Sequence, residues 1–510
     1  MKSCFIGIIF FVGFCFPTKA VEILDEEILL PKTKGTTYEL LNRISDLTGY
    51  LFIYDSDILN SEKKISFPGG THTLQESIYL ITRDRNIQIK IIGKHILLYK
   101  KELASGVVVQ SAPVVNDSLN FIIAKAVVKD AQTKEPIPYA SVSIEKTGVG
   151  TIANQSGEFM IKIPLPDSVQ NILISCVGYN QQLIPIGLFL NHPVDIYLQT
   201  KIVPLQEVII GFVNPQKIIR EMLNNKSVNY QENPVYFTTF YREGVEKKNT
   251  IVSLTEAVFQ IYKTGFESSA DDQVRLLKMR KISNKEENDS IILKIRAGID
   301  ASLHLDIIKY IPDFLDLGDD DPYYYTKIDM TVTDSSLAHV IAFEQKPGIT
   351  APLYKGELYI NADNSALLTA HFNINPDYID KATDIFVLKK PKEVDIKPEN
   401  ADYNVSYKYW NGKYYLNHIR GDLTFKVKKK NGIFQPSKSI HAFFEMVVCK
   451  IDTVDVKRFS RQESIPTHNV FSETKFQYDN HFWGDFNVIL PEKKLNDAIS
   501  RISSKIEEME

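Results

Sequence analysis

Arg242, Glu243 and Glu256 are the residues best suited to chemistry, because they place charges inside segments that have the composition of strands. Two carboxylates that flank one bond can hydrolyse a glycosidic linkage, so Glu243 and Glu256 form a candidate catalytic pair. A buried charge needs an opposite charge beside it. A structural pair between Arg242 and a glutamate is therefore the alternative interpretation, and we prefer it.

Histidines and acidic residues are candidates for binding a metal ion. His441 and Glu445 come nearest to a zinc-binding pair, but at this spacing in a strand they lie on one face as ordinary neighbours. Asp319, Asp320 and Asp321 offer oxygen ligands for calcium without the spacing of a known calcium loop, so we expect an exposed acidic turn there. We assign no catalytic, cofactor-binding or metal-binding residue and expect no cofactor.

Motifs for nucleotide chemistry are equally weak. Gly148 to Ala153 has the letters of a dinucleotide fingerprint, but Asn154 to Gly157 follows it in place of a helix, so we expect a hairpin turn. Neither a P-loop nor a G-x-S-x-G elbow occurs in the sequence. A net charge of −4 does not favour binding to nucleic acid. The sequence therefore predicts a protein that is not an enzyme.

Two surface features point to binding. Lysines at one hairpin tip could contact anionic lipid, or they form the solvated face of a strand and guard a sheet edge. Aromatic residues crowd another hairpin, where a glycan or peptide platform and cross-strand packing are both open interpretations. The lysines are Lys426, Lys428, Lys429 and Lys430, and the aromatic residues are Tyr403, Tyr407, Tyr409, Trp410, Tyr414 and Tyr415.

Residues 1–20 are predicted to be an export signal. Lys2 precedes an apolar run from Cys4 to Phe16, and small residues stand near Ala20, where a signal peptidase would cut. The run is shorter than the roughly 20 residues that span a bilayer, although a retained anchor is the alternative. Phe14 before Cys15 disfavours lipidation. After cleavage only Cys176 and Cys449 remain, and we expect both to be buried thiols.

Residues 121–210 have the pattern of a small antiparallel sandwich, with short β-branched and aromatic strands between Gly, Asn and Pro turns. The expected strands are Ile122–Lys129, Ala140–Glu145, Glu158–Ile163, Asn171–Val177, Val194–Leu198 and Glu207–Ile210. Gly157 suits a turn with positive φ, and Phe159 and Tyr179 are candidate core aromatics.

Four pieces of this segment resemble the carboxypeptidase-regulatory-like β-sandwich, a transthyretin-like module of envelope proteins in two-membrane bacteria. The resemblance implies a docking or stabilising module, since the family module is not a peptidase. The pieces are Pro136–Ala140, Asn154 to Phe159, Ser175–Tyr179 and Leu205–Val208.

Residues 36–100 alternate helix and strand signals. Thr36 with Glu39 and Thr73 with Glu76 are capping boxes, each followed by apolar residues at helical spacing, and Gly49 ends the first helix. The order helix-strand-strand-helix-strand-strand resembles the short N-terminal domain of secretins and TonB-dependent proteins. That resemblance implies a periplasmic module that makes protein contacts. Residues 101–120 have the composition of a linker.

The remaining chain is predicted to be a connecting helix (214–228) and a large β-rich domain (230–510) with a terminal helix along Leu495 to Ile506. Asn411-Gly412 and Asn431-Gly432 mark two-residue hairpins, which predict an antiparallel meander. At Asn229-Tyr230, Phe240–Glu243 and Glu256-Ala257 this domain resembles the large uncharacterised region that often follows such a sandwich in envelope proteins. By architecture alone it resembles the half-open sheet of periplasmic lipoprotein carriers. The fold class is therefore α+β and multidomain.

We expect an exported, non-enzymatic envelope protein with interaction modules and a C-terminal binding domain, linked to outer-membrane transport or signalling. It would reside in the periplasm or at the outer membrane, with envelope proteins as partners and a glycan, peptide or lipid as candidate ligand. A periplasmic carrier of lipid or lipoprotein and a periplasmic hydrolase are the alternatives. A TonB-dependent receptor is disfavoured, because too few residues follow the sandwich for a plug and a 22-stranded barrel.

Overall fold

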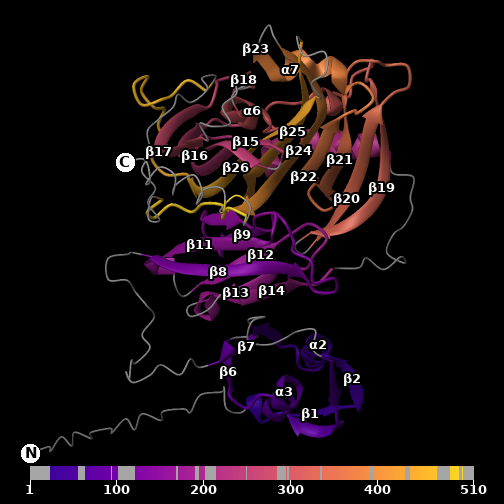
Figure 1. Ribbon diagram of the computed structural model, residues 1–510, viewed down its shortest axis with the longest axis vertical. Helices are drawn as coiled ribbons and strands as arrows, with labels where there is room; N and C mark the ends of the chain where they lie inside the picture. Colours follow the sequence, from indigo (N-terminus) through magenta and orange to yellow (C-terminus); the bar gives the residue numbers. More distant parts are fainter. Residues whose placement is uncertain are drawn as a thin grey trace, which may run out of the picture. The chain divides into compact units, whose positions relative to one another are not determined.

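The chain divides into two compact units, Met1–Gln110 and Ser111–Glu510, in a computed structural model. Figure 1 shows its helices and strands. The structure describes residues 23–54, 64–92, 95–100, 121–167, 170–189, 194–200, 214–248, 250–283, 294–295, 298–333, 336–389, 394–430, 437–467, 483–492, 495 and 497.

The first unit contains helices α2 (Thr37–Thr48) and α3 (Leu74–Thr82) among short strands. The predicted capping box at Thr36 and Glu39 is confirmed, and Gly49 ends α2 with a φ of 73°. Thr73 caps α3 through the backbone N–H of Glu76. The strand pairs are β1 (Glu27–Leu30) with β5 (Gly70–Thr73), β2 (Thr33–Thr36) with β4 (Lys64–Phe67), and β7 (His95–Lys100) with both β3 (Leu51–Tyr54) and β6 (Ile87–Ile92).

Residues 121–200 form two small sheets, which we call the two-sheet module. In one sheet β8 (Phe121–Asp130) pairs with β11 (Glu158–Pro164) and β14 (Val194–Leu198). In the other, β9 (Ser141–Ile144) and β12 (Asn171–Ser175) pair, with β10 (Gly150–Ile152) and β13 (Gln182–Pro185) outside them. The fingerprint-like glycines lie at the β9–β10 hairpin, as predicted.

Three details of this module differ from the prediction. Strand β14 runs parallel to β8, so a purely antiparallel arrangement is wrong. Strands β10 and β13 were not predicted, because their three and four residues carry little alternation. The Cys176 thiol is half-buried, since β12 ends before it at Ser175, whereas Cys449 is fully buried as expected.

The second unit also contains a ten-stranded sheet, which we call the large sheet (Figure 1). All its neighbouring strands are antiparallel, so the predicted meander is confirmed. Its strand order is β17 (Gln273–Ser283), β16 (Thr250–Lys263), β15 (Val235–Lys247), β26 (Lys438–Asp452), β25 (Lys413–Lys429), β24 (Val394–Trp410), β22 (Leu367–Ile374), β21 (Tyr354–Asn361), β20 (Ser336–Gln345) and β19 (Tyr323–Thr333).

Turn chemistry sets the hairpins of this sheet. Asn411 and Gly412 both have positive φ, at 47° and 83°, as the predicted two-residue turn between β24 and β25 requires. Strand β26 then returns to pair with β15, which joins the first and last strands of the domain in the middle of the sheet. Strands that lie far apart in the sequence are therefore neighbours in this sheet. Along each strand, successive side chains alternate between the two faces of the sheet.

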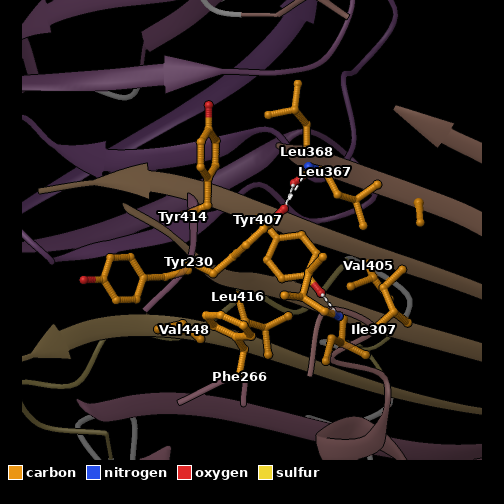
Figure 2. Close-up of a cluster of buried hydrophobic side chains, with 14 of the residues drawn as sticks. Tyr230, Phe266, Ile307, Leu367, Leu368, Val405, Tyr407, Tyr414, Leu416 and Val448 are labelled. Carbon is orange, nitrogen blue, oxygen red and sulfur yellow. Dashed lines mark hydrogen bonds between the residues drawn. The ribbon is translucent and has the colours of Figure 1, made fainter. Parts of the chain in front are cut away.

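One face of the large sheet carries the main hydrophobic core. Helices α4 (Pro215–Asn224) and α6 (Gly298–His304) contribute apolar residues to it, together with the segment around Phe314. Tyr230 is buried there, and its hydroxyl accepts from Leu367 N at 2.8 Å and donates to Leu367 O at 3.1 Å (Figure 2). Burial of the aliphatic and aromatic side chains in this core stabilises the domain.

The same face also holds a buried ionic cluster. Lys263 Nζ lies 2.8 Å from a carboxylate oxygen of both Asp272 and Asp306, and Lys309 contacts Asp272 at 2.7 Å. Tyr407 donates to Asp306 at 2.9 Å. Burial alone would lower the pKa of Lys263, but the two carboxylates raise it above its ordinary value. Every member has a partner, so the cluster is suited to fastening the segment after α6 to the sheet.

Several predictions fall on residues outside those described. They concern the export signal and Cys15, the 101–120 linker, the Leu205–Val208 and Glu207–Ile210 pieces, the Asn431-Gly432 turn and most of the terminal helix. Within the described ranges, no helix has both the length and the apolar composition to cross a membrane.

Candidate binding site

A row of polar side chains crosses eight adjacent strands on the other face of the large sheet. Their cross-strand partners are in register, so every member faces the same side. In strand order from β17 to β21 the row, here called the polar row, is Arg280, Glu256, Arg242, Glu445, Arg420, Asn404, His371 and Glu357.

The first five members of the polar row alternate in charge and are buried. Glu256 lies between Arg242, at 2.8 Å, and Arg280. Glu445 contacts both Arg242, at 3.9 Å, and Arg420, at 3.6 Å. Burial would raise the pKa of Glu256, but the two arginines hold it below its ordinary value. These charges compensate one another, as buried charges must.

Residues 483–492, which we call the strap, and the two-sheet module cover this buried half. Arg242 donates to Ile489 O in the strap at 2.8 Å, and Trp483 lies over the Arg280 guanidinium. From the module, Thr151 donates to Val488 O at 3.4 Å, and Asn154 donates to Leu490 O at 3.3 Å. The strap is therefore hydrogen-bonded to the sheet on one side and to the module on the other.

The candidate catalytic pair is not assembled. Glu256 faces Arg242, whereas Glu243 follows Arg242 in β15 and so points to the opposite face. There Glu243 accepts a hydrogen bond from the Tyr241 hydroxyl at 2.6 Å. Two carboxylates on opposite faces of a sheet cannot flank one bond, so the buried Arg–Glu pair is the correct interpretation.

The last members of the polar row are open to solvent and border a pocket of about 370 Å³. A second in-register row lies beside them on the same four strands. Together the two rows form what we call the polar grid: Lys355 and Glu357 on β21, His371 and Asn373 on β22, Asp402 and Asn404 on β24, and Arg420 and Asp422 on β25. The volume lies within the usual range for small-ligand sites.

Tyr139 of the two-sheet module forms a wall of this pocket. Its ring stacks on His418 with centroids 5.1 Å apart, and the Arg420 guanidinium lies 5.7 Å from the ring centroid. Tyr139 has a φ of 59°, which is unfavourable for a tyrosine. The packing around the ring must offset that strain, so the residue is held in a defined position.

Not every charged group in the polar grid is available to a ligand. Arg420 donates twice to Asp422, at 2.6 and 3.0 Å, so its guanidinium is engaged. Asn404 Nδ2 lies 2.8 Å from His371 Nδ1. Although His371 is partly exposed, the neighbouring atoms shield it enough to lower its pKa, which favours the neutral imidazole at pH 7. Desolvation, with Asp422 opposite, raises the pKa of Asp402.

The predicted metal ligands lie apart. His441 contacts Asp422 at 3.1 Å, whereas Glu445 contacts His418 at 3.0 Å. Asp319 and Asp320 are exposed, and Asp321 instead caps β19 by accepting from Tyr323 N at 2.9 Å. Among the described residues, no three His, Cys, Asp or Glu side chains are grouped so that they could hold a metal ion.

The predicted binding surfaces have ordinary roles in the structure. Tyr407, Tyr414 and Tyr415 are buried in the core, so cross-strand packing explains most of the aromatic hairpin, and Tyr409 is exposed. Lys426 and Lys428 are exposed as expected. They do not guard an edge, because β25 lies between β24 and β26.

The polar grid was missed at the sequence level, although it has a signal there. Each of its strands contains a triplet with polar residues on both sides of a Gly or an aromatic residue: K-G-E, H-F-N, D-Y-N and R-G-D. In a strand the outer two residues share one face, and the central residue faces the other. The central residues here are Gly356, Phe372, Tyr403 and Gly421.

One segment of the chain matches a known protein family. Residues 125–210 match the model of the CarboxypepD_reg-like domain, which agrees with the resemblance seen in the sequence. The match covers a minor part of the chain. The first unit is not matched to the secretin and TonB short domain. No curated protein matches the sequence.

Solved structures give only distant similarity. A DUF1329 family protein from Desulfovibrio piger is 11% identical, with 48% of this chain and 96% of that chain covered and a TM-score of 0.21. A putative outer membrane lipoprotein-sorting protein domain from Vibrio parahaemolyticus is 8% identical (48% and 95% covered, TM-score 0.20). A LolA superfamily protein from Nitrosomonas europaea is 9% identical (48% and 96% covered, TM-score 0.17). Scores this low support no conclusion about fold or function.

Proposed function

We propose that this is an exported, non-enzymatic envelope protein whose second unit binds a polar ligand on the polar grid. The observation that carries the proposal is the composition of the pocket. Eight charged, amide or imidazole residues from four strands line it, together with Gly356, Phe372 and Tyr403, and Tyr139 forms its wall. A concave site with convergent polar groups is the usual form of a binding site.

The two-sheet module has a positioning role in this proposal. The family match and its two sheets agree with a small β-sandwich of the carboxypeptidase-regulatory type. In this chain the module docks on the large sheet and supplies Tyr139 to the pocket. The backbone N–H of Ile451 also donates to Gly148 O at 3.1 Å, which joins the module directly to β26. In this proposal the two-sheet module completes the pocket by supplying Tyr139, while the polar grid binds the ligand.

The two alternatives need features of a different kind. A lipid carrier needs an apolar groove, but the apolar face of the large sheet is packed against α4, α6 and the segment around Phe314. A glycosidase needs two carboxylates beside one bond, and Glu243 and Glu256 lie on opposite faces. A polar ligand held without turnover fits the described residues better than either alternative.

Cell location is tested by fractionation combined with mass measurement of the mature N-terminus. We expect a periplasmic or outer-membrane-associated protein cleaved after Ala20, as the export signal predicts. Recovery of the intact chain from the cytoplasm would remove the envelope part of the proposal.

Binding is tested by calorimetry of the purified mature protein against oligosaccharides, short peptides and phospholipid micelles. We expect binding that is weakened in Asn404→Ala and His371→Ala. Lys428→Ala is the matched control, because Lys428 is exposed on β25 but lies outside the pocket. Mass spectrometry of the bound compound should show no cleavage. Equal binding by the variants and the native protein, or turnover, would contradict the proposal.

A further inference from the structure

The polar grid offers both hydrogen-bond donors and acceptors that the protein does not use. Lys355 and Asn373 have no side-chain hydrogen bond or ion pair within the described part of the chain. Asn404 uses Nδ2 toward His371 Nδ1, which leaves its Oδ1 as an acceptor and His371 Nε2 as a donor. A hydroxyl group, which donates once and accepts twice, can satisfy both kinds of partner.

The charges of the grid disfavour a strongly ionic ligand. Arg420 is engaged by Asp422 and Glu445, so it is not available to an anion. Lys355 and Glu357 lie on one face of β21 with opposite charges, and the Asp402 carboxylate, which accepts a hydrogen bond from Asn400, opposes a further anion. An uncharged ligand meets no unfavourable charge at this surface.

The backbone of the grid is not available to a peptide. The four strands are paired on both sides within the sheet, so their N–H and C=O groups already bond to neighbouring strands. Peptides that bind sheets usually add a strand at an exposed edge, which the grid is not. An acyl chain also lacks a partner here, since Phe372 packs into the core on the opposite face.

The shape of the grid suits a chain of several rings. Four strands at roughly 4.8 Å spacing extend over about 14 Å, longer than a single sugar ring. The Tyr139 ring closes one side, and an aromatic wall can pack against the apolar face of a ring.

We infer that the polar grid binds a neutral oligosaccharide, with Lys355, His371, Asn373 and Asn404 hydrogen-bonding its hydroxyl groups and Tyr139 packing against a ring. This inference rests on the proposed function, since it names the ligand class of the same site.

The probes are cellohexaose, maltohexaose, laminarihexaose and chitohexaose, followed by a printed array of neutral glycans, with hexa-alanine and a lysine-containing hexapeptide as competitors of another class. Calorimetry with the mature protein should show binding of at least one saccharide and no binding of either peptide. Asn373→Ala and Asn404→Ala should each weaken saccharide binding on the order of tenfold. Lys428→Ala should leave it unchanged, and far-ultraviolet circular dichroism should show that every variant is folded.

The outcomes separate this inference from the proposed function. Peptide binding that the grid variants weaken overturns the saccharide class and leaves the binding function standing. Saccharide cleavage overturns the non-enzymatic function and leaves the ligand class standing. If no glycan on the array binds, or if Asn373→Ala and Asn404→Ala bind as tightly as the native protein, the inference is wrong.

Discussion

The ring of Tyr139 stacks on the imidazole of His418 with centroids 5.1 Å apart and an interplanar angle of 25°. These residues are far apart in the sequence, and their contact joins the two-sheet module to the large sheet beside the polar grid. His418 also contacts Glu445, so the stack connects the pocket wall with the buried half of the polar row.

Tyr139→Ala is expected to lower the free energy of unfolding by about 2 kcal/mol, because the ring loses its packing while the backbone keeps its unfavourable φ. Tyr139→Phe keeps the ring and should cost less than about 1 kcal/mol. Urea denaturation of the mature protein measures both. If the two variants are equally stable, the stacked ring does not stabilise the module contact.

Glu256→Ala is expected to destabilise the protein by about 3–5 kcal/mol, because Arg242 and Arg280 would remain buried without their shared carboxylate. Glu399→Ala is the matched control. Its pair with Lys426 is exposed, with the two charged atoms 3.5 Å apart, so its loss should cost less than about 1 kcal/mol. Chemical denaturation at neutral pH compares them, and similar losses in both variants would refute a structural role for the buried row.

His441 is expected to titrate well above His371. The hydrogen bond to Asp422 and the nearby Glu246 carboxylate, 3.8 Å away, raise the pKa of His441 to about 9, whereas desolvation lowers the pKa of His371 below its ordinary value. Because the pKa of His441 is higher in the folded state, its contribution to stability is complete below about 6.5 and is lost as the pH rises through about 9.

Imidazole proton shifts in NMR titrations measure both pKa values directly. His441→Gln should remove part of the fall in stability between neutral pH and pH 9, and His371→Gln should not. A pKa of His441 at or below its ordinary value would disprove the hydrogen bond to Asp422 and the ion pair with Glu246.

Glu243→Gln is expected to leave stability equal or higher at neutral pH. Burial raises the pKa of Glu243, so the charged form is disfavoured in the folded state. A raised carboxyl pKa means that the native protein loses stability as the pH rises through that value, and glutamine removes this loss while it keeps an acceptor for Tyr241. Thermal unfolding at pH 5 and pH 8 tests this. A variant that is less stable at pH 8 would show that the carboxylate charge itself is required.

Much of the local structure was predictable because its causes lie within a few residues. Thr36 with Glu39, and Asn214 with Pro215, define helix starts through side-chain caps and a preset φ. Asn411-Gly412 defines a hairpin because both residues tolerate positive φ. The module that matches a family at residues 125–210 was also predictable, since its turns and strands are consecutive in the chain.

The sequence by itself therefore determined the helix caps, the hairpins, the strand-rich character and the polar-x-polar triplets of the grid. Only the tertiary structure decided that Arg242 meets Glu445, that Tyr139 meets His418, and that the four triplets lie in register on one face. The alternation of residues along a strand indicates which side chains share a face. It does not indicate which other strand will pair with that strand. For Arg242 with Glu445, and for Tyr139 with His418, that choice depends on packing between segments about 200 or more residues apart, so no local signal contains it.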